Sequence, residues 1–350
     1  MNFASDNVGP AAPEIMAAMS EANAARSAPY GADPWTERAE ALIREVFEAP
    51  EASVHLVSSG SAANALALAA MTRPWEAIFT HETAHIEMDE AGAPEFFTGG
   101  AKLRRVPGDA GKITPAALEA AIAEVPQGDV HSVQRGPLSL TQLTEWGSAY
   151  TPEELSALSA SARRHGMRTH LDGARLANAI AAAGVSPAEM TRLAGIDALS
   201  LGGTKNGCLA VEAVVFFDPA RGSEISHRRK RAGHLWSKHR FLGAQMAAYL
   251  KDGLWLKLAQ RANARLAELL EGLRALTEAE IEVEPAGNMV FFRLPRAMHA
   301  SAFAAGAAYS VRGDLDEGLP GETPLLARIV CDWSCRSEDI AALLTAWRGA

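Results

Sequence analysis

The stretch LSLGGTKNGCL, residues 199–209, places a lone lysine after an apolar, strand-like segment and two glycines. Gly202 and Gly203 have no side chains to pack, and they permit backbone conformations that other residues avoid. Lysine is among the residues least often buried, so Lys205 considered alone is typical of a surface turn. The rest of the sequence decides whether this lysine has a function.

Strand-like and helix-like segments alternate on both sides of this stretch. Thr-Pro pairs at residues 114–115 and 151–152 are typical helix starts. Because the connections are short, the pattern predicts an α/β fold with a mainly parallel sheet and helices on both faces. The strands are expected at 53–59, 76–81, 131–142, 168–172, 197–203 and 211–218, and the helices at 61–71, 114–125, 151–166 and 174–184.

The pattern changes after about residue 240. One long helix is expected over residues 241–276, because apolar residues recur there at helical spacing. Strands at 281–284, 289–294 and 327–333 then interleave with helices at 297–306 and 337–347. The sequence therefore predicts a large domain over 1–240, with an N-terminal arm, and a small C-terminal α+β domain over 241–350.

Composition excludes several classes of protein. The chain has 350 residues and a formal net charge of −9, which argues against broad nucleic-acid binding. No window reaches the roughly 18 apolar residues of a membrane span, and the first residues do not form a signal peptide. Cys208, Cys331 and Cys335 lack the spacing of a disulfide framework or a zinc site. We expect a cytoplasmic protein without a metal.

Polar residues follow successive strands of the predicted sheet. In open α/β sheets, ligands bind at the carboxyl ends of the strands. The segment SSGSAAN, residues 58–64, enters a helix and offers N–H groups and hydroxyls to a phosphate. His85 follows the second strand, Asp172 and Arg175 follow a third, and Lys205 follows a fourth. Each has an ordinary alternative, such as a helix cap or a solvated side chain.

Together these residues match the needs of pyridoxal 5'-phosphate (PLP). This cofactor requires an anion site, a lysine for a Schiff base and an acidic partner for its pyridine nitrogen. Glycines beside Lys205 allow the backbone to approach a ligand closely, and partial desolvation helps a lysine to lose its proton. We therefore predict that Lys205 binds the cofactor.

Arg328 stands inside the apolar strand LLARIV. A buried guanidinium is unfavourable unless it is paired, and a substrate carboxylate held by two parallel hydrogen bonds is a suitable partner. The alternative is an edge strand on which Arg328 points to solvent.

Several segments of the chain are similar to one known family. They are NFASDNVGPAAPEIMAAM, PYGADPWTERAEALIREVF, HLDGAR, GGTKNG, MVFFRL and ARIVCDWSCRSEDI. Across nearly its whole length, the chain resembles the threonine aldolases, which are PLP enzymes of fold type I related to the β-eliminating lyases. This fold implies a mainly parallel, seven-stranded sheet flanked by helices in the large domain.

The resemblance implies a role for each candidate residue. Lys205 forms the Schiff base, Asp172 keeps the pyridine nitrogen protonated, and His85 stacks on the ring; these three form the catalytic set. Arg175 contacts the phenolic oxygen of the ring. The other implied contacts are Ser59, Gly60, Ser61 and Thr204 to the phosphate, and Ser5 and Arg328 to the substrate carboxylate.

One segment departs from the better-known branch of the family. Many relatives have Asn-Thr-His-Asn where this chain has SLTQLTEWGSAY, residues 139–150, without a histidine. The segment resembles a second branch with a Thr-Gln-x-Thr-Glu run. The residue that acts on the β-hydroxyl group is therefore left open between His85, directly or through a water, and contributions from Gln142, Thr144 or Glu145.

A basic cluster, HRRKRAGHLWSKHR, occupies residues 227–240 of this acidic chain. Like charges at helical spacing repel one another, so the cluster calls for a compensating anion. The resemblance implies a homodimer or homotetramer with shared active sites. Arg240 or Arg231 would contact the neighbouring chain's phosphate, with Arg240 the preferred candidate, and Tyr30 would contribute to substrate binding at the same interface.

The implied reaction is retro-aldol cleavage of L-threonine, L-allo-threonine and other β-hydroxy-α-amino acids to glycine and an aldehyde. The alternatives are another fold type I enzyme, such as a phenylserine aldolase, a β-eliminating lyase, an aminotransferase or a hydroxymethyltransferase. A PLP-binding protein without catalytic activity is a further alternative.

Overall fold

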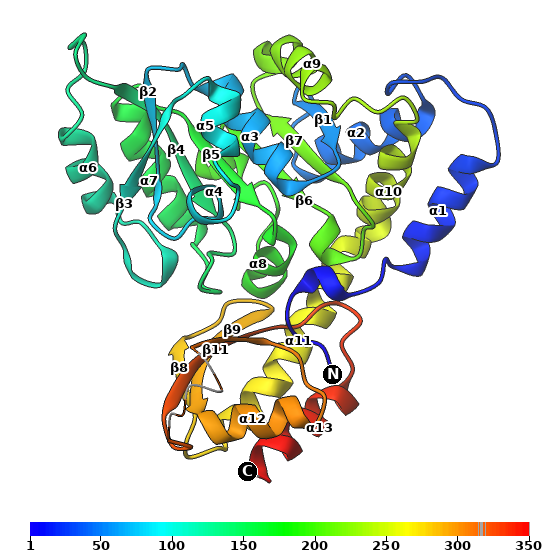
Figure 1. Cartoon of the computed structure of the whole chain (residues 1–350). Coiled ribbons are helices and arrows are strands. Elements are labelled where there is room, and N and C mark those ends of the chain that lie inside the picture. Colours follow the sequence, from blue (N-terminus) through cyan, green and yellow to red (C-terminus); the bar gives the residue numbers. More distant parts are fainter. Residues whose placement is uncertain (314, 316–317, 319, 350) are drawn as a thin grey trace.

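A seven-stranded sheet forms the centre of the larger part of the protein (Figure 1). The structure is a computed structural model that describes residues 1–313, 315, 318 and 320–349. The strand order of the sheet is β1-β7-β6-β5-β4-β2-β3. Strand β7 runs antiparallel to β1 and β6, whereas the other pairs are parallel, which confirms the predicted sheet. The strands are β1 Ser53–Val57, β2 Glu76–His81, β3 Lys102–Val106, β4 Gln134–Thr141, β5 Thr169–Gly173, β6 Ala198–Gly202 and β7 Glu212–Phe216.

Helices cover both faces of this sheet because alternate strand residues point to opposite sides. On β7, Val214 packs with α3 and α9, whereas Val215 packs into the core beneath α2, α7, α8 and α10. Helix α3 is buried from Ala62 to Ala70, in keeping with its alanine- and leucine-rich sequence. The helices around this sheet are α1 Pro13–Asn23, α2 Pro34–Val46, α3 Gly60–Met71, α4 His85–Met88, α5 Ala93–Thr98, α6 Pro115–Ala123, α7 Pro152–Arg164, α8 Leu176–Ala183, α9 Gly222–Arg231 and α10 Arg240–Leu250.

The expected single helix over 241–276 is wrong, because the chain forms α10 and then α11, Leu254–Arg274. Asp252 and Gly253 between them adopt left-handed backbone, with φ of 53° and 67°. An Asp-Gly pair is a strong turn signal, and here it outweighs the apolar periodicity.

Helix α10 packs on α1 and α2. Along α11, core residues of the large sheet continue to Ala259, and those of the small sheet begin at Leu266. The domain boundary near residue 240 stays a prediction.

The smaller part contains an antiparallel sheet with the order β10-β11-β9-β8. Its strands are β8 Glu280–Val283, β9 Met289–Pro295, β10 Ser310–Arg312 and β11 Pro324–Val330, and its covering helices are α11, α12 Arg296–Ala304 and α13 Ser337–Arg348. The sequence analysis did not identify β3 or β10. Both lie at sheet edges, where polar or short strands are common, so neither carries a clear apolar pattern.

The N-terminal segment connects the two parts. Phe3 is buried in the core of the small sheet, and its backbone bonds to Ala308 and Val330. The segment then forms a short 3₁₀ helix, η1 Asp6–Val8, which lies against the Lys205 turn η4, Thr204–Asn206. Residues 1–8 thus extend from the small sheet to the carboxyl ends of the large sheet.

Candidate active site

A cavity of about 250 Å³ lies where the strands β1, β2, β5 and β6 lead into loops and helices. This is the edge of an open α/β sheet at which ligands bind. The predicted residues that line the cavity are Ser59, Gly60, Ser61, His85, Asp172, Thr204 and Lys205. Asn64, Glu90 and Glu212 also line it, and none of them belonged to the predicted site. Glu145, which was considered for the β-hydroxyl group, lines the cavity as well.

Close backbone packing explains the two glycines before Lys205. A Cβ atom on Gly202 would lie 2.4 Å from the carbonyl oxygen of Ala174, and one on Gly203 would lie 2.6 Å from that of Val211. Both distances are shorter than real Cβ contacts, so any larger residue would displace the backbone. The glycines therefore allow Lys205 to enter the cavity on a tightly packed turn.

The start of α3 provides the predicted anion site. Ser59 is the N-cap, and its Oγ accepts a hydrogen bond from Ala62 N at 3.4 Å. The first N–H groups of an α-helix have no partner inside the helix, and the helix dipole favours a negative charge there. A Cβ atom on Gly60 would meet no atom within 4 Å, so the space in front of the turn is open. These donors fit a phosphate group.

A chain of hydrogen bonds joins Asp172 to His85. Asn64 Nδ2 donates to Asp172 Oδ2 at 2.9 Å and to Glu90 Oε1 at 3.0 Å. His85 Nδ1 lies 2.9 Å from the same Glu90 oxygen. The hydrogen bond with Glu90 raises the pKa of His85, and the charge of Asp172 acts in the same direction although burial opposes both. Asn64 could have been found from the sequence, since it interrupts the alanine-rich run of α3.

Arg175 pairs with a residue that the sequence analysis did not single out. Its Nε and Nη2 donate to the two carboxylate oxygens of Asp6, at 2.6 and 2.9 Å. Burial by itself would lower the pKa of Arg175, but the charge and hydrogen bonds of Asp6, together with the charges of Glu145 and Asp172, outweigh burial and raise the pKa. Asn288 of the small part donates to Asp6 Oδ2 at 3.2 Å. Arg175 is thus held beside the cavity, and its contact with the cofactor stays a prediction.

Arg328 is half-buried on β11, and its side chain is only partly engaged. Nη2 donates to the Ala4 carbonyl oxygen at 3.2 Å, whereas the buried Nε has no hydrogen-bond partner among the described residues. Burial lowers the pKa of Arg328, and the charge of Arg175 lowers it further. Ser5 follows Ala4 in the chain, and its Oγ accepts a hydrogen bond from Asn7 N at 3.1 Å. Asn7 in turn lines the cavity. Such an unpaired buried donor is suited to an anionic ligand.

Tyr30 and Arg240 do not line the cavity of their own chain. Tyr30 is 49% exposed, and Lys230 Nζ lies 4.7 Å from the centre of its ring. Arg240 Nε donates to the Ala22 carbonyl oxygen at 3.0 Å. Part of the basic cluster also has a partner within the chain, because Arg228 forms an ion pair with Glu224 at 2.6 Å. The roles of Tyr30 and Arg240 at an interface stay predictions.

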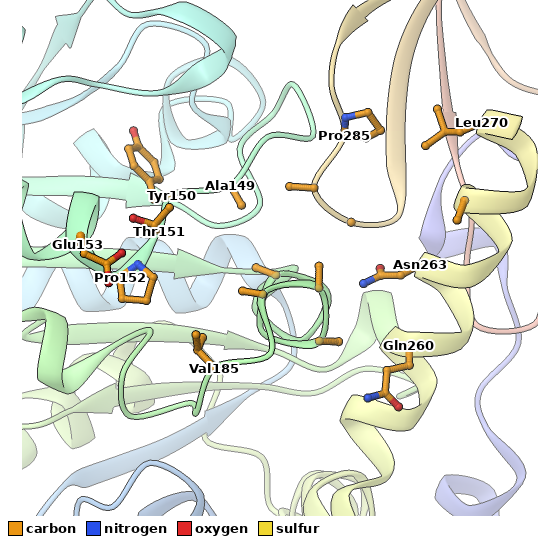
Figure 2. A pocket seen from close by; sticks show the side chains of 17 residues that line it. Ala149, Tyr150, Thr151, Pro152, Glu153, Val185, Gln260, Asn263, Leu270 and Pro285 are labelled. Atoms are coloured by element: carbon orange, nitrogen blue, oxygen red, sulfur yellow. The ribbon is translucent and has the colours of Figure 1, made fainter. Parts of the chain in front are cut away.

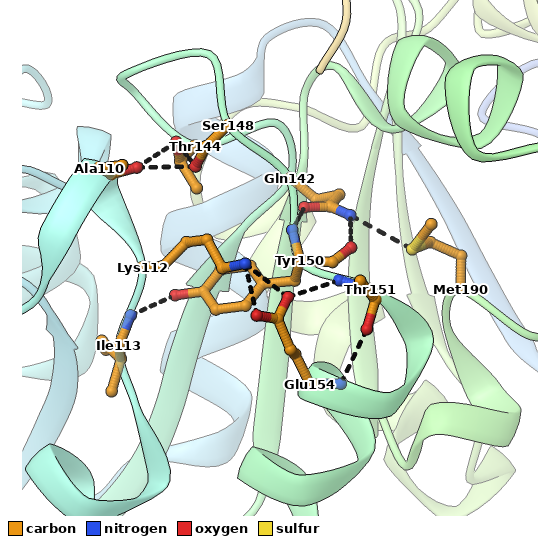
Figure 3. Close-up of polar contacts among 10 residues, drawn as sticks. All are labelled: Ala110, Lys112, Ile113, Gln142, Thr144, Ser148, Tyr150, Thr151, Glu154 and Met190. Carbon is orange, nitrogen blue, oxygen red and sulfur yellow. Dashed lines mark hydrogen bonds and ion pairs between the residues drawn. The ribbon is translucent and has the colours of Figure 1, made fainter. Parts of the chain in front are cut away.

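Figure 3 shows the segment after β4, in which two of the three residues considered for the β-hydroxyl group have structural contacts. Gln142 is fully buried and bonds to both the N–H and the carbonyl group of Tyr150. Thr144 Oγ1 donates to the Ala110 carbonyl oxygen at 3.0 Å. Of the three, only Glu145 lines the cavity.

A larger cavity of about 740 Å³ lies between α8, α11 and the 285–287 loop (Figure 2). Its lining is rich in alanine, and among the described residues there it offers one carboxylate, Glu153, and no lysine, arginine or histidine. It therefore lacks the groups that the predicted chemistry needs.

Across the described ranges, no cluster of three His, Cys, Asp or Glu side chains is arranged to hold a metal ion. None of the helices that the structure describes is both long and apolar enough to cross a membrane.

Known proteins match this sequence and fold over nearly their full length. Low specificity L-threonine aldolase of Pseudomonas aeruginosa is 40% identical over 342 residues, which are 97% of this chain and 95% of the relative. The enzyme of the same name from a Pseudomonas species is 42% identical over 293 residues, which are 83% of this chain and 84% of the relative. The structure of Leishmania major threonine aldolase has a TM-score of 0.91 at 29% identity, and the match covers 99% of this chain and 98% of that one.

The family assignment follows from these matches. The β-eliminating lyase family matches residues 2–295. The architecture, with one large mainly parallel sheet and one small antiparallel sheet, is that of fold type I PLP enzymes. The chain is therefore a lyase of the β-eliminating lyase family and belongs with the low-specificity L-threonine aldolases.

Proposed function

We propose that this chain is a PLP-dependent aldolase that cleaves L-threonine, L-allo-threonine and related β-hydroxy-α-amino acids into glycine and an aldehyde. The observation that carries the proposal is the meeting of Lys205, Asp172 and the start of α3 at one cavity. The unpartnered Nε of Arg328 beside this region supports a substrate with a carboxylate. The threonine aldolase relatives, which match nearly the whole chain, support the same reaction.

The donor set of the cavity fits PLP. The helix start at Ser59, Gly60 and Ser61 would hold the phosphate, and Thr204, which lines the same cavity, would assist. The buried Asp172 would face the pyridine nitrogen, and Lys205 would bind the cofactor through a Schiff base. When bound, this cofactor supplies an electron sink that stabilises negative charge on the α-carbon of an amino acid.

The chain's own residues would bind the substrate and move its protons. Arg328 and Ser5 would hold the carboxylate, which fixes the orientation of the bond that breaks. His85 would accept the proton of the β-hydroxyl group as the Cα–Cβ bond breaks, and Glu90 holds its ring through Nδ1. Because the hydrogen bond with Glu90 raises the pKa of His85, this base would become neutral at a higher pH than an ordinary histidine, and activity should rise with pH as His85 loses its proton.

The decisive assay supplies the purified protein and PLP with L-threonine, L-allo-threonine and phenylserine. Release of glycine and free aldehyde without a folate would support the proposal. An aminotransferase would instead form a keto acid, and a hydroxymethyltransferase would need a folate. A binding protein without catalytic activity would take up PLP and release no product.

Replacing Arg328 with leucine should raise KM for threonine roughly 10- to 100-fold, the scale of a lost hydrogen bond to a charged group. The absorbance of bound cofactor should stay unchanged, because Arg328 does not line the cofactor cavity. Arg293→Leu is the control, since Arg293 pairs with Glu282 on β8 and β9 of the same sheet. A normal KM in Arg328→Leu would move the carboxylate site elsewhere, with Arg312 as the next candidate.

We further propose a cytoplasmic homodimer or homotetramer with shared sites, in which Arg240 contacts the neighbouring chain's phosphate. The exposure of Tyr30 and the basic residues of α9 beside it support such an interface. Mixing Lys205→Ala chains with Arg240→Ala chains under subunit exchange should restore one intact site per hybrid dimer. Activity that equals the sum of the parents after proven exchange would contradict a shared site.

A further inference from the structure

Glu212 is a buried carboxylate that the proposed reaction does not use. It is the first residue of β7, and it lies opposite Gly202 in the antiparallel pair of β6 and β7. Its Oε2 accepts a hydrogen bond from Gly203 N at 2.8 Å, and its Oε1 accepts a longer one from Thr204 N at 3.4 Å. The side chain also lines the cavity together with Lys205. One carboxylate thus joins the backbone of the lysine turn to the cavity that contains the lysine.

Burial of this carboxylate is unfavourable unless its charge is compensated. Glu212 is 5% exposed, and within the part of the chain that the structure describes it forms no ion pair. Burial raises the pKa of Glu212 to about 7, although the bonds from the turn and the charge of Lys205 oppose this shift. Glu212 therefore changes its charge close to neutral pH.

Lys205 is the positive charge that acts on Glu212. Two other titratable groups feel the charge of Glu212, namely Cys208 in the following turn and Tyr249 on α10. Burial raises the pKa of both far above neutrality, so both side chains are uncharged when Glu212 ionises. The electrostatic effect of Glu212 is consequently directed at Lys205.

A purely structural role does not require a carboxylate at this position. The rest of β7 is apolar and buried, and a glutamine at position 212 could still accept the bond from Gly203 N. A glutamate, by contrast, adds a charge that opposes its own burial. The two roles make different predictions for the variant Glu212→Gln, which retains the shape and loses the charge.

We propose that Glu212 is a positioning residue for Lys205: it fixes the turn that carries the lysine, and its negative charge controls the reactivity of the lysine amine toward electrophiles. A nearby negative charge favours the ammonium form of a lysine, whereas the neutral amine is the nucleophile. A negative charge at position 212 thus makes Lys205 less reactive, and an uncharged side chain there makes it more reactive. This inference rests on the proposed role of Lys205 and is independent of the amino acid substrate.

The test measures the reactivity of Lys205 in the cofactor-free protein. Wild type, Glu212→Gln and Glu212→Asp are treated briefly with acetic anhydride at pH 8, and acetylation of each lysine is quantified by peptide mass spectrometry. Lys205 should be acetylated roughly tenfold faster in Glu212→Gln, the change in rate that a lost interaction of about 1.4 kcal/mol produces. Glu212→Asp should stay near the wild-type rate. Lys257 on α11 serves as the internal reference, and Glu82→Gln is the control for an exposed carboxylate.

An unchanged rate at Lys205 in Glu212→Gln would overturn the proposal. An equal increase at Lys257 would also overturn it, because that result indicates general loosening of the structure. Since Glu212→Gln can fail to fold, a reciprocal measurement uses Lys205→Met. Removal of the lysine charge should raise the titration midpoint of Glu212, followed by carboxyl ¹³C NMR, and an unmoved midpoint would overturn the proposal. Neither measurement requires threonine cleavage, so a wild type that fails the aldolase assay would leave this inference standing.

Discussion

Replacing Lys205 with alanine is expected to abolish multiple turnover and the visible absorbance of cofactor bound as a Schiff base. No other lysine lines the cavity among the described residues, so a Schiff base has no substitute partner there. Absorbance spectroscopy of the purified, PLP-treated protein checks the first expectation. Borohydride reduction followed by peptide mapping should attach the cofactor to the peptide of residue 205 in the wild type and to no cavity peptide in the variant.

Lys257→Ala is the matched control, because Lys257 lies on α11 outside the candidate site. It should keep the spectrum and the activity of the wild type. Retention of both properties by Lys205→Ala would show that the cofactor assignment is wrong.

Replacing Asp172 with asparagine should lower kcat by at least about 10²-fold, the scale of a lost electrostatic group in a catalytic site. An asparagine cannot stabilise a protonated pyridine nitrogen by charge. It also conflicts with its surroundings, since Asn64 Nδ2 and Ala174 N each donate to one oxygen of Asp172. The NH₂ group of the variant would face one of these donors. Steady-state kinetics measure the loss, and cofactor absorbance should show that PLP still binds.

Asn64→Ala separates the charge of Asp172 from its orientation. This variant keeps the carboxylate and removes one of its hydrogen-bond donors, so we expect a much smaller loss of kcat than in Asp172→Asn. A near-normal kcat in Asp172→Asn would mean that the electron sink is not tuned by this residue.

Local sequence signals were sufficient for much of the fold and for the residues at strand ends. The glycines before Lys205, the Thr-Pro helix starts and the Ser-Gly-Ser turn act within a few residues of themselves, so they can be recognised without tertiary information. The edge strand β3 could not be recognised from the sequence, because KLRRV lacks the apolar alternation of a half-buried strand. The helix break at Asp252 and Gly253 was missed because apolar spacing continued on both sides.

The missed cavity residues depend on contacts that the sequence does not reveal. Glu212 reaches the lysine turn only because β7 runs antiparallel to β6, whereas the neighbouring strands suggested parallel pairing. Glu90 reaches Asn64 across 26 residues, and Asp6 reaches Arg175 across 169. Such pairs become visible once the sheet order and the course of the N-terminal segment are known.

The N-terminal segment has a consequence for the order in which the protein is made. Asp6 bonds to Asn288, which is 282 residues away, and the Ala4 carbonyl accepts from Arg328, which is 324 residues away. Protein synthesis begins at the N-terminus, so the large sheet can form while the last strands of the small sheet have yet to be synthesised. The N-terminal segment beside the cavity gains all of these partners only after Arg328 has left the ribosome. A chain still in synthesis therefore contains Lys205 long before it contains a complete substrate site.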